Sequence, residues 1–429
     1  MTQSSHGLIR TIGRWSLTAL MINSIIGGGI FGLPSLVAAK LSGYSPIAYL
    51  IAAAGISTIA ACIAEVSSRY EETGGLYLYA RDALGRFAGL LVAWLTWLTR
   101  IAAPAAVANI FCTYLAQFFP LANVGYIRLL VLAVLLGHLA LFNYMGVKNG
   151  KNLSNIFTVA KVGFLLFFIV FGLLILLFRP EIRVPLMLPA VSAKTWFETF
   201  LLLVYAYGGF EGAMFVGGES TNPKRDTPIA LLLAVAAVSV LYTLVQFVVV
   251  ATLPDPASAI RPLSDAAQHF LGSAGAAVMA LAALVSTYGY LSANLLHSPR
   301  ITFAMADQGD FPALLGAVHP KYRTPYVSII LYAAIVFVFA ALGNFRWNAT
   351  LSAASRLAIY GAMAIAVPVL RSRHDDKAQF RIPVPYLFAG LALLFSVVLL
   401  TQMGHVEFYV VAATCALALL NWLFVRRKQ

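Results

Sequence analysis

The sequence predicts an all-α protein that lies within a membrane and crosses it twelve times. Three observations support this class. Apolar residues make up 61% of the 429 residues and charged residues only 10%, whereas soluble domains carry about 25% charged residues. The mean hydropathy is high, at +0.85. The apolar residues are gathered into twelve segments, most of them near the ~20 residues that a helix needs to cross a bilayer.

Each segment is expected to be helical, because backbone polar groups inside lipid must be paired within the chain. The alternating pattern of a membrane β-barrel is absent from the sequence. We therefore treat residues 1–429 as one transmembrane domain. In order, the expected spans are 15–39, 46–67, 86–118, 124–145, 153–178, 196–219, 229–253, 273–302, 325–343, 349–370, 385–402 and 406–425.

The positions of lysine and arginine predict the orientation, since loops on the cytoplasmic side carry an excess of both. With the N-terminus inside and alternating spans, most of the 29 lysines and arginines fall in inner loops. Both termini are therefore expected in the cytoplasm. The net charge of +13 is explained by this bias, and no nucleic-acid partner is expected. Short loops and short ends are typical of a bacterial inner-membrane protein.

Two of the expected spans contain glycine runs. Gly27, Gly28 and Gly29 interrupt the first span, and Gly208 and Gly209 interrupt the sixth. Each glycine inside a helix costs about 1 kcal/mol relative to alanine. The first and sixth positions suit two repeats of five spans, and paired interruptions of this kind indicate a transporter binding site. The alternative is that these glycines only allow close helix packing.

An interrupted helix offers chemistry that an intact one does not. The N-terminus of a half-helix presents N–H groups and a positive dipole end to an anion. Carbonyl groups that the break frees face a cation. An amino acid carries a carboxylate and an ammonium group on one carbon, so it matches both.

Four stretches resemble the amino acid–polyamine–organocation superfamily of transporters, and the match extends over nearly the whole chain. They are IGGGIF at 26–31, GFE at 209–211, ESTNPKRDTP at 219–228, and the inner region 298–325 with SPR, AMAD and HPKYRTP.

This resemblance implies the leucine-transporter (LeuT) fold, with a lipid bilayer as its surroundings. In that fold two inverted repeats of five helices are followed by two accessory helices. The first helix of each repeat is broken. Here the first repeat corresponds to 13–178, the inverted second repeat to 195–370, and the accessory helices to 384–425.

The resemblance also implies a substrate site at the two breaks. The substrate carboxylate is expected at the backbone N–H groups of Gly28 and Gly29, next to Gly27. Many relatives carry serine where this chain has Gly28, so one hydroxyl contact is missing. Tyr205 lies near the position of an aromatic gate. The carbonyl groups expected to meet the ammonium belong to Ile25, Tyr205, Ala206 and Gly208.

Four charged residues lie inside expected spans, namely Arg100, Lys161, Glu211 and Arg356. A charge there costs at least ~2.5–3.5 kcal/mol and indicates a function by default. Proton-coupled relatives carry a lysine where Lys161 stands, in the place that a sodium ion takes elsewhere in the fold. Lys161 is therefore expected either to couple transport to protons or only to brace the first span, which would suit an exchanger.

The other three charges also allow two interpretations each. Glu211 directly follows the second break, where relatives use an acid for proton-linked gating, but it could instead be the fixed partner of an arginine. Arg100 lies in the third span, which relatives turn towards the substrate side chain. Together with Arg356 it would favour an acidic amino acid or another anion. The alternative is a structural network of Arg100, Glu211 and Arg356.

Isolated polar residues in the spans receive simpler interpretations. Ser286 and Thr287 could bind sodium, although hydroxyls in apolar helices more often bond back to the helix backbone. His138 and His297 are isolated and are expected to be hydrogen-bonded packing residues. No metal-ligand or catalytic spacing occurs, so neither a metal, a cofactor nor an enzymatic activity is expected.

The sequence thus predicts a secondary transporter that moves amino acids across the cytoplasmic membrane by alternating access, coupled to protons. Two alternatives stay open. One is an amino acid exchanger without ion coupling. The other is a transporter of acidic amino acids or other small organic anions.

Overall fold

The computed structural model describes residues 12–71, 75–146, 150–214, 220–307, 309, 311–373 and 378–426. The predicted all-helical class is confirmed for this part of the chain, where the only β feature is an isolated bridge between Ile12 and Ser220. Glu219, which belongs to one of the family motifs, lies outside the described residues.

The first half of the chain begins with a helix pair where one span was expected. A break at residues 26–28 separates these two helices. A short helix also occupies the expected inner loop between the second and third spans. The helices of this half are α1 (Arg14–Ile25), α2 (Gly29–Leu41), η1 (Ser42–Tyr44), α3 (Ser45–Ser67), α4 (Gly75–Leu84), α5 (Arg86–Leu115), η2 (Pro120–Asn123), α6 (Gly125–Met145), α7 (Gly150–Phe178) and η3 (Pro180–Ile182).

The second half also begins with a broken helix, interrupted at residues 208–209. The helices of this half are α8 (Ala193–Tyr207), α9 (Phe210–Met214), α10 (Pro223–Thr252), α11 (Pro262–Asp307), η5 (Ala313–Gly316), α12 (Tyr326–Leu342), α13 (Phe345–Ser372), α14 (Pro385–Leu400) and α15 (His405–Arg426).

Several predicted boundaries were wrong, and local chemistry explains the differences. Helix α8 starts earlier than expected because the Ser192 side chain accepts a hydrogen bond from the Thr195 N–H at 3.2 Å. Asn344 caps α13 in the same way, through the Trp347 N–H at 2.9 Å. Such caps satisfy N–H groups that the first helical turn leaves free. Helix α11 extends beyond 273–302 at both ends, with a kink at Gly272, whose φ is +70°.

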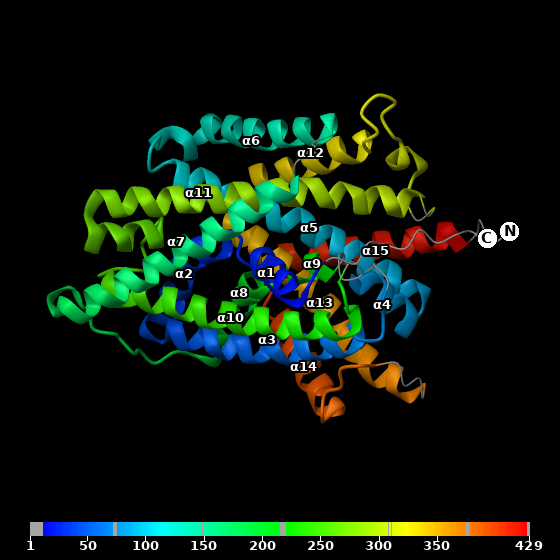
Figure 1. Cartoon of the computed structure of the whole chain (residues 1–429), viewed down its shortest axis with the longest axis horizontal. Coiled ribbons are helices and arrows are strands. Elements are labelled where there is room, and N and C mark those ends of the chain that lie inside the picture. Colours follow the sequence, from blue (N-terminus) through cyan, green and yellow to red (C-terminus); the bar gives the residue numbers. More distant parts are fainter. Residues whose placement is uncertain are drawn as a thin grey trace.

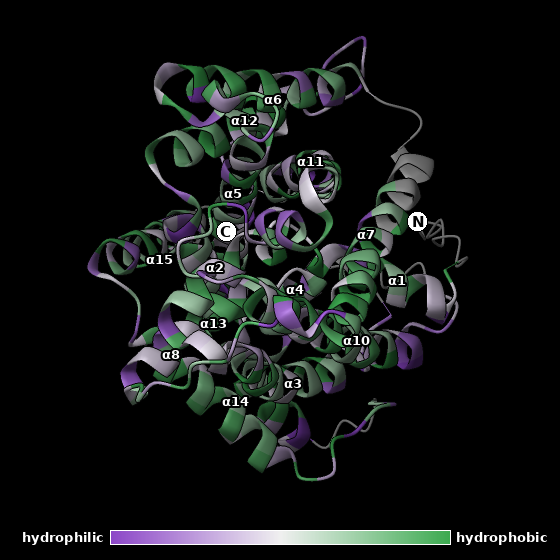
Figure 2. Ribbon diagram, turned by 90° about the vertical axis from the view of Figure 1, so that its left-hand side faces the viewer, coloured by the Kyte–Doolittle hydropathy of each residue, from purple (hydrophilic) through white to green (hydrophobic). Residues whose placement is uncertain are grey.

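The peripheral helices consist largely of apolar residues (Figure 2). Eight helical stretches among the described residues are long and apolar enough to cross a membrane. Helices α12 and α14 are apolar but shorter. In the most apolar window of α6 only 22% of residues are buried, and in that of α15 only 11%. Apolar exposure of this extent suits lipid as the surrounding solvent.

The broken helices lie in the middle of the molecule. Figure 1 shows α1, α8 and α9 there, with α6, α11 and α12 on one side and α3, α10 and α14 on the other. The larger apolar cluster draws on α1, α2, α3, α8, α10 and α13, and a second cluster draws on α5, α6, α11 and α12. Ile25 and Ile26 at the first break belong to the larger cluster, and Tyr207 and Phe210 at the second break belong to it as well.

Candidate functional site

The two helix breaks lie against each other. Helix α2 packs on α8, and α1 packs on α9, so the halves pair crosswise. A Cβ atom on Gly29 would lie 3.3 Å from Ala206 Cα, and one on Gly209 would overlap the carbonyl oxygen of Ser24. Gly209 also has φ of +120°, a conformation that only glycine adopts readily. The glycine runs thus permit close backbone approach in addition to breaking the helices.

The two half-helices that start at the breaks differ in charge. Helix α2 begins at Gly29 and has no acidic residue in its first turn. Its first N–H groups have no partner within the helix, and its positive dipole end favours an anion. Helix α9, in contrast, carries Glu211 in its first turn. The Glu211 carboxylate accepts a hydrogen bond from the Gly209 N–H at 2.8 Å, so an acid of the protein already occupies that helix end.

Three side chains from other helices face the first glycine run. An ideal Cβ on Gly27 would lie 3.0 Å from the ring of Tyr290 on α11, and one on Gly28 would lie 3.1 Å from Val107 on α5. The same construction on Gly29 meets the Tyr205 ring at 3.4 Å. Our reading of the sequence missed Tyr290 and Val107, because one aromatic or aliphatic residue in an apolar helix looks like any core residue.

Carbonyl groups that the first break frees are bound by side chains. Lys161 on α7 is 2% exposed, and its Nζ donates to the Ile26 oxygen at 2.9 Å and to the Asn23 oxygen at 3.3 Å. The hydroxyl of Tyr242 on α10 donates to the Ile25 oxygen at 3.3 Å. The Ile25 carbonyl was expected to receive a substrate ammonium. It already accepts one hydrogen bond and keeps a second lone pair.

An ion pair lies at the second break. Arg356 Nε on α13 donates to Glu211 Oε1 at 2.6 Å. Tyr360 Oη donates to the other carboxylate oxygen at 3.3 Å, and Arg356 Nη1 donates to Ser352 Oγ at 2.8 Å. A Cβ on Gly208 would lie 2.6 Å from Arg356 Cδ. The absence of a side chain at position 208 therefore allows the arginine to reach the glutamate.

Arg100 and Tyr205 reach the same region from different sides. An ideal Cβ on Gly212 would lie 3.2 Å from Arg100 Nη2, so this guanidinium lies beside α9. The backbone oxygen of Arg100 accepts a hydrogen bond from the Tyr332 hydroxyl. The Tyr205 ring is buried and packs edge-to-face on Phe345, with ring centroids 5.8 Å apart.

The isolated polar residues fall into two groups. Thr287 Oγ1 bonds back to the Ala283 oxygen at 2.6 Å, as expected, whereas the buried Ser286 hydroxyl has no partner among the described residues. His138 is hydrogen-bonded to the Val134 oxygen at 2.8 Å and to the Tyr288 hydroxyl at 3.1 Å, which confirms its predicted packing role. The prediction for His297 was wrong, because its side chain is exposed on the surface of α11.

Ion pairs tie the ends of the broken helices to their neighbours. At the start of α1, Arg14 Nη2 lies 2.9 Å from Asp226 Oδ1 on α10. The Thr221 N–H donates to the Ile12 oxygen at 3.0 Å in the same place. At the opposite end of the first span, Lys40 Nζ on α2 lies 2.5 Å from Glu198 Oε2 on α8. The segment around Asp226 is one of the motifs that carried the family resemblance.

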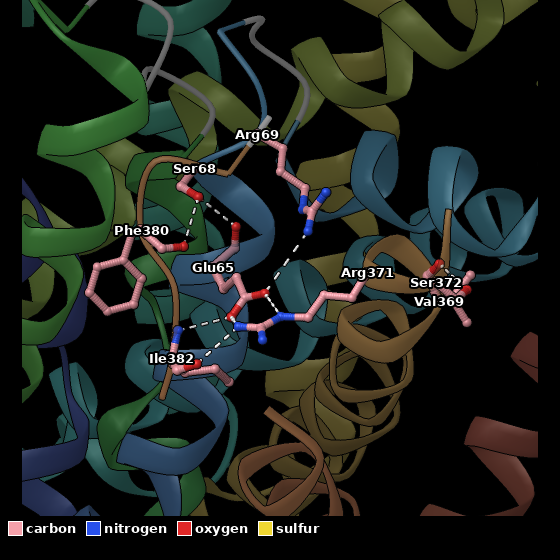
Figure 3. A network of polar contacts seen from close by, with 8 residues as sticks. All are labelled: Glu65, Ser68, Arg69, Val369, Arg371, Ser372, Phe380 and Ile382. Carbon is pink, nitrogen blue, oxygen red and sulfur yellow. Dashed lines mark hydrogen bonds and ion pairs between the residues drawn. The ribbon is translucent and has the colours of Figure 1, made fainter. Parts of the chain in front are cut away.

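A second buried glutamate joins three parts of the chain (Figure 3). Glu65 on α3 accepts hydrogen bonds from Arg371 Nε at 2.6 Å and Arg371 Nη2 at 2.7 Å. It also accepts one from the Ile382 N–H at 3.0 Å, while Ser68 Oγ donates to the Phe380 oxygen at 3.2 Å. This network fastens the end of α13, and the segment that leads to α14, onto α3.

Comparison with known proteins identifies the family. The family model described as amino acid permease matches residues 12–419. The methylthioribose transporter of Bacillus subtilis (strain 168) is 29% identical over 91% of this chain and 88% of its own length. The serine/threonine exchanger SteT of the same organism is 28% identical over 90% and 89%. Its branched-chain amino acid permease BcaP is 25% identical over 100% and 95%. The chain therefore belongs to the amino acid permease family, within the amino acid–polyamine–organocation superfamily of membrane transporters.

Proposed function

We propose that this protein is a secondary active transporter of amino acids that works by alternating access and is coupled to protons. The observation that carries the proposal is that the two helix breaks lie against each other, with α2 packed on α8 and α1 packed on α9. One of them leaves the N-terminus of α2 without an acid of its own. The substrate carboxylate would bind at Gly28 and Gly29, beside Gly27. Its ammonium would bind carbonyl groups of Ile25, Tyr205, Ala206 and Gly208.

The proposal includes twelve spans in a LeuT-type arrangement. Counting each broken helix as one segment, and leaving out the short α4, gives twelve α-helical segments in the described part of the chain, and this number supports the proposal. In this arrangement α1 to α7 form one repeat, α8 to α13 form the inverted repeat, and α14 and α15 are the accessory helices. The distribution of lysine and arginine supports an inner-membrane location with both termini in the cytoplasm.

Lys161 supports coupling to protons. Its buried ammonium binds two carbonyl groups at the first break, and a lysine that released its proton would lose the charge that holds them. Proton binding would thereby be linked to the shape of the substrate site. The same contacts also suit a fixed brace, so exchange without ion coupling is the second candidate function.

The charge around the breaks supports a third candidate, an acidic amino acid or another small organic anion. Arg100 lies beside α9, and Arg356 is paired with the single carboxylate of Glu211. The relatives are named for a sugar thioether, for serine and threonine, and for branched-chain amino acids. Their names therefore leave the substrate class open, and the test needs a broad panel.

The test is uptake by purified protein in liposomes. The labelled panel contains glutamate, alanine, serine, leucine and methylthioribose. Each compound is tested with an inward proton gradient, with a sodium gradient, and with unlabelled compound inside. Uptake driven by protons supports the proposal, and uptake only against internal amino acid indicates an exchanger. If no amino acid is taken up under any condition, the amino acid proposal is wrong.

A further inference from the structure

One face of α10 contacts both halves of the broken first span. Tyr242 and Gln246 are four residues apart, so their side chains lie on the same face of the helix. The Tyr242 hydroxyl donates to the oxygen of Ile25, the last residue of α1, at 3.3 Å. Gln246 Nε2 donates to the oxygen of Pro34, within α2, at 3.2 Å. Two adjacent side chains of one helix therefore span the break.

Both side chains are held rigidly. Tyr242 and Gln246 are each 0% exposed. The Tyr242 ring packs against Tyr49 and Tyr207, with ring centroids 6.3 Å and 5.8 Å away. Gln246 Nε2 also donates to Ser45 Oγ at 2.9 Å. Because neither side chain can change its rotamer without disturbing its neighbours, the distance between their two carbonyl partners is fixed by the α10 backbone.

A second helix, α7, also contributes a side chain to the first break. Lys161 on α7 binds the Asn23 and Ile26 carbonyls, and Tyr242 binds the carbonyl of Ile25 between them. A polar side chain within an apolar span costs free energy, and such residues are usually hydrogen-bonded and functional. Tyr242 binds the oxygen of Ile25 at the end of α1, where the helix stops, and Gln246 adds a bond to the oxygen of Pro34 within α2.

We infer that Tyr242 and Gln246 are positioning residues, which fix the gap between α1 and α2 and so set the spacing of the backbone groups that bind substrate. This inference rests on the proposed function for its effect on transport, but its structural part does not. Neither residue is among the groups proposed to bind the substrate. They act through the Ile25 and Pro34 carbonyls.

The structural part is tested by hydrogen–deuterium exchange of the purified protein, without any substrate. Tyr242→Phe removes the hydroxyl and Gln246→Met removes the donor, while both keep the side-chain shape. Each variant is expected to speed the exchange of amides in residues 26–33 roughly fivefold, as the loss of one hydrogen bond implies. Tyr207→Phe is the matched control, since its ring also packs against Tyr242 but its hydroxyl bonds the Tyr49 oxygen on α3 instead of a carbonyl of α1 or α2. The inference would be overturned if Tyr207→Phe sped amide exchange at residues 26–33 as much as Tyr242→Phe does. It would also be overturned if neither Tyr242→Phe nor Gln246→Met changed that exchange.

The functional part uses whichever panel compound is transported. Tyr242→Phe is expected to raise KM several-fold while the maximal rate stays within twofold, whereas Tyr207→Phe leaves KM unchanged. If Tyr242→Phe only made the protein less stable, its maximal rate would fall and its KM would stay unchanged. That result would contradict a positioning role. If the panel shows no transport but exchange at the break responds as expected, the proposed function fails and the positioning role of α10 stands.

Discussion

Arg356 on α13 and Glu211 on α9 form a buried ion pair, with 2.6 Å between Nε and Oε1. Their side chains are only 5% and 8% exposed. The glutamate also binds the Gly209 N–H at the second helix break. One carboxylate thus stabilises the N-terminus of α9 and neutralises an arginine from another span. This contact supports the interpretation of Glu211 as a fixed partner, and gating by Glu211 would require the pair to separate.

Breaking this pair is expected to be costly. Glu211→Gln and Arg356→Gln each leave one buried charge without its counter-charge, which destabilises proteins by about 3–5 kcal/mol. The double variant is expected to lose clearly less stability than the sum of the losses in the two single variants. Denaturation of the purified variants in mixed micelles measures the coupling. Additive losses would show that the two side chains do not depend on each other.

Replacing Arg371 is expected to destabilise the protein more than replacing Glu65, although the two side chains form one ion pair. Glu65 is 1% exposed, whereas the Arg371 side chain is 26% exposed. Arg371→Met leaves a buried carboxylate whose remaining cationic neighbour is Arg69, with Nη2 4.0 Å from Oε1, at a cost of about 3 kcal/mol. Glu65→Gln leaves a guanidinium that reaches water, at a cost of about 1 kcal/mol. Denaturation midpoints of the two variants measure which one is less stable. A larger loss in Glu65→Gln would contradict the argument that the more deeply buried charge costs more when it is left unpaired.

Two glycines are expected to respond in opposite ways to alanine. Gly209→Ala places a side chain at φ of +120°, against the Ser24 carbonyl, and is expected to cost about 1–3 kcal/mol or more. Gly137 lies within α6 with no atom within 4 Å of its ideal Cβ. Gly137→Ala is expected to gain about 0.5–1 kcal/mol. Thermal unfolding of both variants tests the pair, and equal losses would show that the break geometry is unimportant.

Lys161→Ala is expected to remove proton-driven uptake while counterflow against internal substrate persists. In the wild type, uptake should rise as the external pH falls, because the inward proton gradient grows, and this dependence should flatten in the variant. Lys40→Met, which removes a partly exposed lysine near the end of α2, is the control. If Lys161→Ala lowers driven uptake and counterflow equally, the lysine is a brace and transport is exchange.

Arg100→Ala tests whether this guanidinium meets the substrate side chain. If an acidic compound is transported, the variant is expected to lose glutamate uptake at least tenfold relative to uptake of serine. Arg100→Lys, which keeps the charge, should retain part of the preference. The ratio of initial rates for the two labelled compounds is the measurement. A fall in thermal stability with an unchanged ratio would assign Arg100 to structure alone.

The helical class, the apolar segments and both helix breaks could be predicted from the sequence, because composition and glycine act locally. A run such as Gly27, Gly28 and Gly29 weakens a helix wherever it stands. Segment ends were less predictable, since caps such as Ser192 and Asn344 depend on a single hydrogen bond. The extension of α11 past Gly272 was missed for a similar reason, as a kink and a helix end look alike in sequence.

Among the charged residues, the sequence by itself determined only that Arg100, Lys161, Glu211 and Arg356 needed partners, because an isolated charge at membrane depth is too costly. Which partners they have was decided by the tertiary structure. Glu211 meets Arg356 although 145 positions separate them, and Lys161 binds carbonyls 135 and 138 positions away. Tyr242, Gln246 and Tyr290 gain their importance only from what they face. Such pairings depend on how whole helices pack, which no local pattern of residues records.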